Sequence, residues 1–107
     1  MGKIETITLN GCSGKSYDFN VYPTGTNFKA LGALYFISKR NGSHSGIYLG
    51  ITNDLSNRFN AHHKEGCFKK HSANCISILL NSSDRDRQII EKDILCNYNF
   101  PCNNINN

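Results

Sequence analysis

Long apolar runs are missing from this sequence: no stretch approaches the length of a membrane span, and the first residues carry no secretory signal core. Internal repeats and low-complexity linkers are also missing, and the only two prolines lie far apart. These absences argue against a membrane protein, a repeat protein and a largely disordered chain. We expect the 107 residues to form one domain with a modest core.

The cysteines lack the regular spacing of a disulfide framework. There are five, an odd number, and none forms a CxxC pair. This pattern predicts free thiols in a reducing compartment, so we expect a cytoplasmic protein. Twelve basic against eight acidic residues give a net charge of +4, which fits a polyanionic partner without requiring one.

Alternating and aromatic-rich segments predict five short strands. The turn Asn41-Gly42 favours an antiparallel hairpin between the third and the fourth. We expect the strands at residues 4–9, 17–22, 33–38, 46–51 and 75–80.

Two helices are expected beside these strands. The first runs from about residue 53 to about residue 65 and is followed by a polar, basic loop over 66–74. The second covers 84–97, and Pro101 prevents further helix.

The sequence therefore predicts an α+β fold, with a small, mostly antiparallel sheet flanked by two helices. From residue 31 the order is strand, strand, helix, strand, helix around a three-stranded core. We assign 1–30 to an extra N-terminal hairpin, 31–103 to the main domain and 104–107 to a polar tail.

Two tyrosines are candidates for a site on neighbouring strands. Strand alternation places Tyr35 and Tyr48 side by side, with Gly50 leaving space next to Tyr48. They are candidates for proton transfer. The alternative is an aromatic cross-strand pair that only packs the sheet.

Arg58 and His62 are four residues apart on the first predicted helix, so they share a face and can reach one phosphate. The alternative for Arg58 is a surface pair with Asp54, and for His62 an ordinary polar position at a helix edge. Glu91 on the second predicted helix is a candidate ligand for Mg²⁺ or Mn²⁺, with a helix pair to Arg87 as the alternative.

The joint pattern resembles the GIY-YIG nuclease family over residues 33–103. Ala33-Leu34-Tyr35 and Tyr48-Leu49-Gly50 stand where the family has its two tripeptides, although the first has lost its Gly and Ile and the second has Leu for Ile. The other matching positions are Arg58, His62, Glu91 and Asn103.

The resemblance implies a divalent-metal-dependent endonuclease that nicks one DNA strand with low sequence specificity. Tyr35 would help to deprotonate the attacking water, with help from Tyr48, and Arg58 would stabilise the developing charge. Glu91 would bind a single Mg²⁺ or Mn²⁺ ion. His62 would position water or accept a proton, and Asn103 would hold the site together. Double-strand cutting would require a homodimer or a second event.

Basic and aromatic residues after the first predicted helix are candidates for contact with single-stranded, structured or duplex DNA. They are Lys64, Phe68, Lys69 and Lys70. A solvated loop is the alternative. A nucleic-acid-binding module with the nuclease fold and little or no cleavage is a second functional hypothesis.

A small zinc-stabilised interaction domain is a third hypothesis. Thiolate and imidazole are suitable zinc ligands, and His63, Cys67, His71 and Cys75 lie close together in the sequence. Their intervals are not those of a zinc finger. His71 is alternatively a supporting residue of the nuclease site, and His63 a structural residue.

Overall fold

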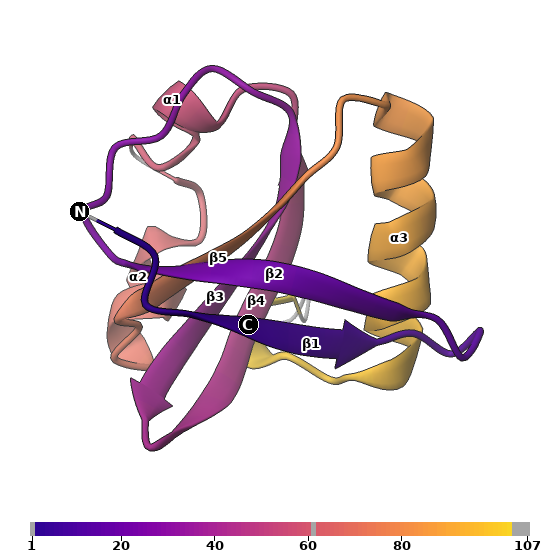
Figure 1. Cartoon of the computed structure of the whole chain (residues 1–107). Helices are drawn as coiled ribbons and strands as arrows, with labels where there is room; N and C mark the ends of the chain where they lie inside the picture. Colours follow the sequence, from indigo (N-terminus) through magenta and orange to yellow (C-terminus); the bar gives the residue numbers. More distant parts are fainter. Residues whose placement is uncertain (1, 61, 104–107) are drawn as a thin grey trace.

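The computed structural model describes residues 2–60 and 62–103, whose strands form one five-stranded antiparallel sheet in the order β1-β2-β5-β3-β4 (Figure 1). Three α-helices and a final 3₁₀ turn, η1, accompany it among these residues. The strands are β1 Glu5–Asn10, β2 Ser16–Pro23, β3 Ala33–Asn41, β4 Ser43–Thr52 and β5 Cys75–Leu80. The helical segments are α1 Leu55–Arg58, α2 Glu65–Lys70, α3 Asp84–Asn97 and η1 Pro101–Asn103.

The N-terminal hairpin widens the sheet. β3 is the central strand of the expected three-stranded core and pairs with β4 on one side and β5 on the other. β2 adds to the free edge of β5, with Val21 opposite Ser77, and β1 then pairs with β2. The α+β class and the antiparallel pairing are confirmed, while the sheet has five strands rather than three.

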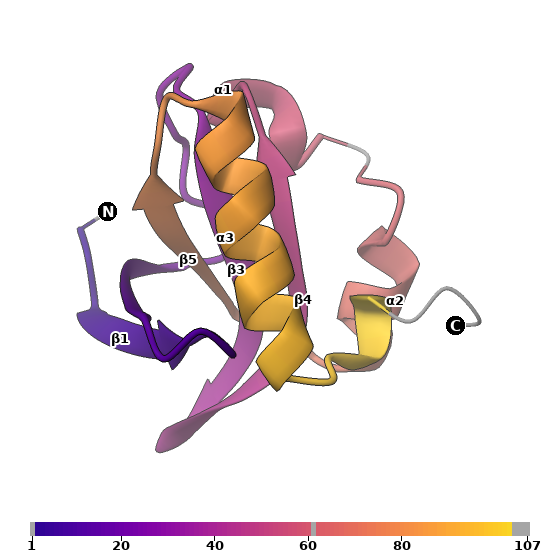
Figure 2. The same cartoon turned by 90° about the vertical axis from the view of Figure 1, so that its right-hand side faces the viewer.

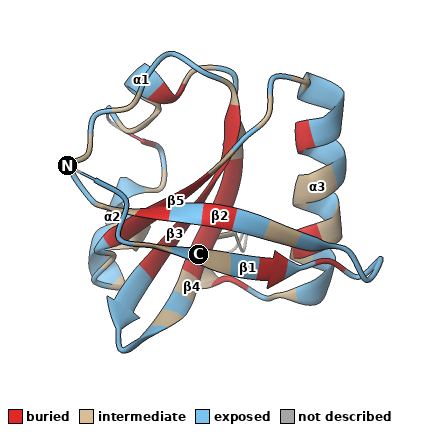
Figure 3. Cartoon of the chain, in the orientation of Figure 1, coloured by how far each residue is buried: buried red, intermediate tan, exposed pale blue. Residues whose placement is uncertain are grey.

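Both faces of the sheet are covered, so β3 is buried along most of its length (Figure 3). Successive side chains of a strand point to opposite faces. Leu34 and Phe36 pack in one core cluster with Ile94 of α3. Tyr35 and Ile37 belong to the other cluster, which also contains Leu55 of α1. Figure 2 shows α3 crossing the sheet on one side, with α1 and α2 beyond it on the other.

The first predicted helix is wrong in its extent. α1 covers only Leu55–Arg58, where the side chain of Asp54 accepts from Ser56 N. A second short helix, α2, occupies Glu65–Lys70 and so covers the first five residues of the expected loop 66–74. Beyond the end of α1 the N–H of Lys64 donates to the ring of His62, whereas in a continuous helix it would bond the carbonyl four residues earlier.

The second predicted helix is confirmed as α3, Asp84–Asn97, with the Ser83 hydroxyl accepting from Asp86 N at its start. Asp93 ties α3 to the turn between β1 and β2, because its carboxylate accepts from Ser13 N over 2.8 Å and from Tyr17 Oη over 2.7 Å. None of the helices in the described ranges 2–60 and 62–103 is long and apolar enough to cross a membrane.

The prediction of free thiols is wrong for four of the five cysteines. Cys12 is bonded to Cys96 across 84 residues, and Cys67 to Cys102 across 35. Cys75 is free and buried in β5. Each bonded pair joins segments far apart in the sequence, so spacing alone gave no signal for it.

Candidate active site

Tyr35 lies at the centre of the candidate site. Its hydroxyl oxygen accepts a hydrogen bond from Arg58 Nε over 2.9 Å and lies 2.7 Å from His62 Nε2. The side chain of Tyr35 is 0% exposed, so the core rings and these two neighbours enclose the phenol. The fold thus brings together a strand residue, the last residue of α1 and a residue of the following loop.

His62 contacts Tyr35 through a defined tautomer. The backbone N–H of Lys64 donates to His62 Nδ1 over 3.0 Å, so Nδ1 is an acceptor and the ring proton is on Nε2. Nε2–H therefore donates to Tyr35 Oη. Burial and, to a smaller extent, the charge of Arg58 lower the pKa of His62 to about 4, which keeps the ring neutral. Both ring nitrogens of His62 therefore take part in hydrogen bonds within the protein.

The protonation of Tyr35 depends on opposing influences. Burial raises its pKa, repulsion from Tyr48 adds to the rise, and the hydrogen bond from Arg58 opposes it. A hydrogen bond with Tyr48 also raises the pKa of Tyr35. Because Tyr35 Oη already accepts from two donors, its own proton is available for Tyr48. Tyr35 is therefore a neutral phenol that donates toward its neighbour.

Tyr48 stands beside Tyr35 on the edge strand β4, with the ring centroids 5.9 Å apart. A Cβ on Gly50 would lie 2.5 Å from Tyr35 Oη and 2.7 Å from Tyr48 Cε2, so a side chain does not fit here. The expected side-by-side tyrosines are confirmed, and the space at Gly50 holds the Tyr35 hydroxyl. Tyr48 is 9% exposed against 0% for Tyr35, so it is the tyrosine nearer to solvent.

Asn103 supports this arrangement from η1. Its side chain binds the backbone of Leu49, the residue between Tyr48 and Gly50. Asn103 is therefore placed where the sequence predicted a supporting residue.

Glu91 lies outside the tyrosine cluster. Its helix packs on the face of the sheet opposite Tyr35 and α1 (Figure 2). Within the described residues Glu91 makes no hydrogen bond with the cluster, and burial alone raises its pKa. Arg87 is not its partner, because Arg87 donates to Asn81 O over 2.8 Å and to Asp84 Oδ1 over 3.3 Å.

α3, which carries Glu91, packs in a different core cluster from the two tyrosines. Helical periodicity puts Glu91 on the flank of α3 away from Asp93, which contacts the β1–β2 turn. Arg87 and Asp84, one and two turns before Glu91, line a cavity of ≈ 320 Å³ together with Arg58. This cavity connects the α3 side of β4 with the guanidinium that contacts Tyr35.

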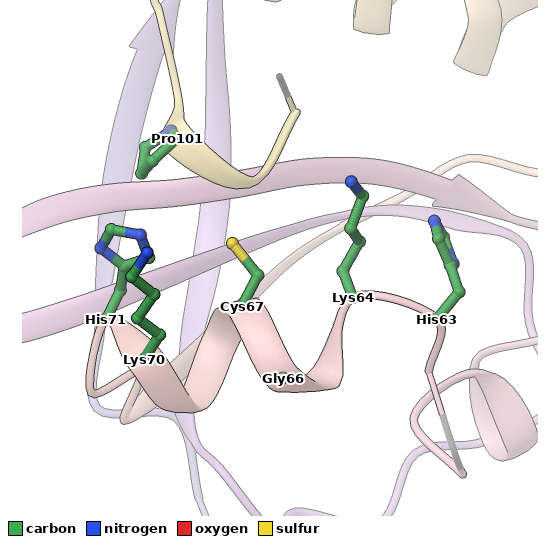
Figure 4. A pocket seen from close by; sticks show the side chains of 7 residues that line it. All are labelled: His63, Lys64, Gly66, Cys67, Lys70, His71 and Pro101. Atoms are coloured by element: carbon green, nitrogen blue, oxygen red, sulfur yellow. The ribbon is translucent and has the colours of Figure 1, made fainter. Parts of the chain in front are cut away.

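A larger cavity of ≈ 790 Å³ lies over α2 and beneath the turn at Pro101 (Figure 4). Lys64 and Lys70 give it positive charge. The side chains of Lys64 and His63 rise from the same side of the chain as Cys67, and the ring of His71 stands near Pro101. The residues that line it are His63, Lys64, Gly66, Cys67, Lys70, His71 and Pro101.

Two predicted nucleic-acid contacts have other partners in the structure. The ring of Phe68 packs against Tyr48, at 5.4 Å between centroids, and against His62, at 4.9 Å. It supports the tyrosine cluster and is not a free stacking platform. Lys69 forms an exposed ion pair with Glu65 over 3.4 Å.

The predicted zinc set is corrected by the structure. Cys75 lies in β5, buried and apart from the others, and His63 is not in the group. Cys67, His71 and Cys102 instead have their ligand atoms within 4.8 Å of one another. The four-residue spacing of Cys67 and His71 indicates two of these three candidate ligands, whereas nothing in the sequence indicated Cys102. His71 therefore belongs to this group and not to the tyrosine cluster.

No family model, curated protein or solved structure matches the chain. A functional interpretation consequently depends on the geometry of the site and on the sequence pattern described above.

Proposed function

We propose that this chain is a divalent-metal-dependent endonuclease that hydrolyses phosphodiester bonds in DNA and nicks one strand with low sequence specificity. The observation that supports the proposal most is the convergence of Arg58 Nε and His62 Nε2 on the hydroxyl of Tyr35. Packing alone does not require two N–H donors on one buried oxygen, whereas a cluster that controls the proton of a phenol requires such donors.

In the proposed reaction the base is Tyr48 in its phenolate form, which takes the proton of the attacking water and becomes the neutral phenol. Tyr48 is the more exposed of the two tyrosines, and its ring lies beside that of Tyr35. Tyr35 in turn is held by Arg58 and His62, so His62 acts as a positioning residue. This assignment shifts the main base role from Tyr35, which the sequence favoured, to its neighbour.

Arg58 has a second task in this proposal. Its Nε is engaged with Tyr35, while its terminal NH₂ groups make no hydrogen bond within the described part of the chain. They line the cavity of ≈ 320 Å³ that also contains Asn53 and Arg87. A guanidinium fork facing such a cavity suits bidentate contact with a phosphate and stabilises the charge that develops during hydrolysis.

Glu91 is the residue that would hold Mg²⁺ or Mn²⁺. Its carboxylate is half-buried, and no described cation offsets the burial that raises its pKa, so a metal ion suits this position. When bound, the ion supplies stabilisation of the charge on the leaving oxygen. The DNA backbone would pass the edge of β4, since Arg58 and the flank of α3 that carries Glu91 lie on either side of that edge.

The cavity over α2 extends the proposed DNA path. Lys64 and Lys70 offer two positive charges in this cavity, and the backbone N–H of Lys64 binds the ring of His62. Contacts of this kind bind the sugar–phosphate backbone without reading bases, which agrees with low sequence specificity.

A cleavage assay tests the proposal. Supercoiled plasmid and labelled single-stranded DNA are incubated with the protein and Mg²⁺, Mn²⁺ or a chelator. Nicked circles should accumulate with either metal and not with the chelator. Tyr48→Phe and Arg58→Ala should each lower the rate by about 100-fold or more, and Glu91→Gln should abolish the cleavage that Mg²⁺ or Mn²⁺ supports. Tyr22→Phe, a partly buried tyrosine in contact with Phe28, is the matched control and should cut normally.

Other results would exclude the enzyme. DNA binding without cutting under every condition would favour the second hypothesis, a nucleic-acid-binding module. Cutting that survives in Tyr48→Phe and Arg58→Ala would indicate a contaminating nuclease or a different site.

A further inference from the structure

The cysteine and histidine group on α2 and η1 has a geometry that the nuclease proposal does not use. Cys67 lies in α2, and His71 follows four residues later at its end, so the two side chains share one face of the helix. Cys102 approaches this face from η1 and is bonded to Cys67. Figure 4 shows Cys67 and His71 on the side of α2 that faces the Pro101 turn.

These three residues present suitable donors for a soft cation. The ligand atoms of Cys67, His71 and Cys102 lie within 4.8 Å of one another. Two thiolates and one imidazole are a common zinc donor set, and zinc sites with three protein ligands complete a tetrahedron with water. The cavity of ≈ 790 Å³ beside Cys67 and His71 provides room for that fourth ligand.

The positive charge nearby does not prevent such a site. Lys64 and Lys70 line the same cavity. Two thiolates neutralise the double charge of Zn²⁺, so the lysines face a centre without net charge. The partial burial of His71 and the complete burial of Cys102 limit exchange of the metal with solvent.

We propose that Cys67, His71 and Cys102 bind one Zn²⁺ ion when the Cys67–Cys102 disulfide is reduced. A thiol reductant delivers two electrons and two protons to the disulfide and is itself oxidised to a disulfide. The two resulting thiols then lose their protons to solvent as their sulfur atoms bind the metal, while His71 binds as the neutral imidazole. The disulfide and the zinc site exclude each other because they use the same sulfur atoms.

Replacing the Cys67–Cys102 disulfide by zinc keeps α2 and η1 connected. In the oxidised chain a covalent bond joins them, and in the reduced chain the metal does so through the same two residues. η1 also carries Asn103, which binds the backbone next to Tyr48. The edge of the tyrosine cluster is therefore held in both redox states, and the reduced, metal-free chain is the form that loses this support.

Zinc and cobalt binding test the proposal on the full chain. The protein is reduced with a phosphine, freed of reductant without oxygen, and titrated with Zn²⁺ or Co²⁺. We expect one metal ion per reduced chain, a thiolate-to-cobalt charge-transfer band, a higher melting temperature with Zn²⁺, and no binding by the oxidised chain. Cys102→Ser and His71→Gln should each weaken zinc binding by more than about 100-fold. A residue that only orients a metal ligand would cost about 10- to 100-fold when it is replaced.

Matched variants separate this site from other effects. Cys75→Ser, His63→Gln and the double variant Cys12→Ser/Cys96→Ser should keep one zinc per reduced chain. His71→Gln leaves the Cys67–Cys102 disulfide able to form, so its oxidised form checks that the variant folds. Reduced wild-type protein that retains no zinc would overturn the proposal. So would zinc binding that His71→Gln leaves intact or that the Cys12 and Cys96 substitutions remove.

Discussion

The side-chain amide of Asn103 pairs with the backbone of Leu49 as a neighbouring strand would. Asn103 Oδ1 accepts from Leu49 N over 2.8 Å, and Asn103 Nδ2 donates to Leu49 O over 2.8 Å. Because β4 is the edge strand of the sheet, these two backbone groups have no strand partner on that side. One side chain thus fixes the edge at the residue between Tyr48 and Gly50.

Substitution of Asn103 tests this contact. Asn103→Asp keeps an acceptor for Leu49 N but cannot donate to Leu49 O, and Asn103→Ala loses both hydrogen bonds. Since the affected groups are partly buried, we expect Asn103→Ala to lower the free energy of unfolding by about 1–3 kcal/mol. Urea denaturation measures the loss. Equal stability of the alanine variant and the wild type would show that water replaces the side chain without cost.

Gly50 and Gly66 form a contrasting pair for alanine substitution. At Gly50 the added Cβ would lie 2.5 Å from the Tyr35 ring and hydroxyl, whereas at Gly66 it meets nothing within 4 Å. We expect Gly50→Ala to lower the free energy of unfolding by about 1–3 kcal/mol because two buried rings must move. Gly66→Ala, inside α2, should raise it by about 0.5–1 kcal/mol. Thermal melts of both variants measure these changes. A Gly50→Ala variant as stable as the wild type would contradict the described packing of the tyrosines.

His62 should make the stability of the protein depend on pH. Burial lowers its pKa to about 4, below the value of an unfolded histidine, so the unfolded chain binds this proton first as the pH falls. Stability contributed by neutral His62 is fully present above about pH 6.5 and declines as the pH falls toward 4. The decline should be on the order of 2 kcal/mol.

A histidine-by-histidine comparison isolates that effect. His62→Gln should remove most of the decline between pH 6.5 and 4, although the variant is less stable at neutral pH. His63→Gln changes an exposed neighbour whose charge is a lesser cause of the lowered pKa than burial, so it should keep most of the decline. Denaturation curves recorded across this pH range give the result. Identical slopes for wild type and His62→Gln would show that another group titrates.

Arg58→Lys tests the geometry of the guanidinium separately from its charge. Lysine keeps the positive charge but has no planar fork that reaches both Tyr35 and a phosphate. We expect single-turnover DNA cleavage to slow by about 100-fold, with DNA affinity changed much less. Arg85→Lys, at an exposed position on α3, is the control. Normal cleavage by Arg58→Lys would mean that charge alone matters at this position.

Most of the secondary structure could be predicted from short-range patterns in the sequence. The five strands and α3 were predicted because alternation, turn residues and the Ser83 cap act over a few neighbouring residues. The single helix over 53–65 was wrong because periodicity reveals neither that the helix ends at Arg58 nor that the N–H of Lys64 binds the ring of His62. Arg58 and His62 still reach Tyr35, but from a helix end and a loop rather than from one helix face.

The parts of the site that depend on distant segments were harder to predict. Asn103 and Cys102 come from the last described turn, and only folding brings them to β4 and α2. The position of Glu91 could not be predicted from local patterns either, because the whole chain determines on which face of the sheet α3 packs. Periodicity identified which residues share an element, and it did not identify which elements meet.

The bond between Cys12 and Cys96 spans 84 residues and so converts most of the polypeptide into a covalent ring. A protease that cleaves one loop within this ring leaves both fragments attached to each other. Such a nicked molecule would migrate as a single species on a non-reducing gel and separate into two pieces only after a reductant is added.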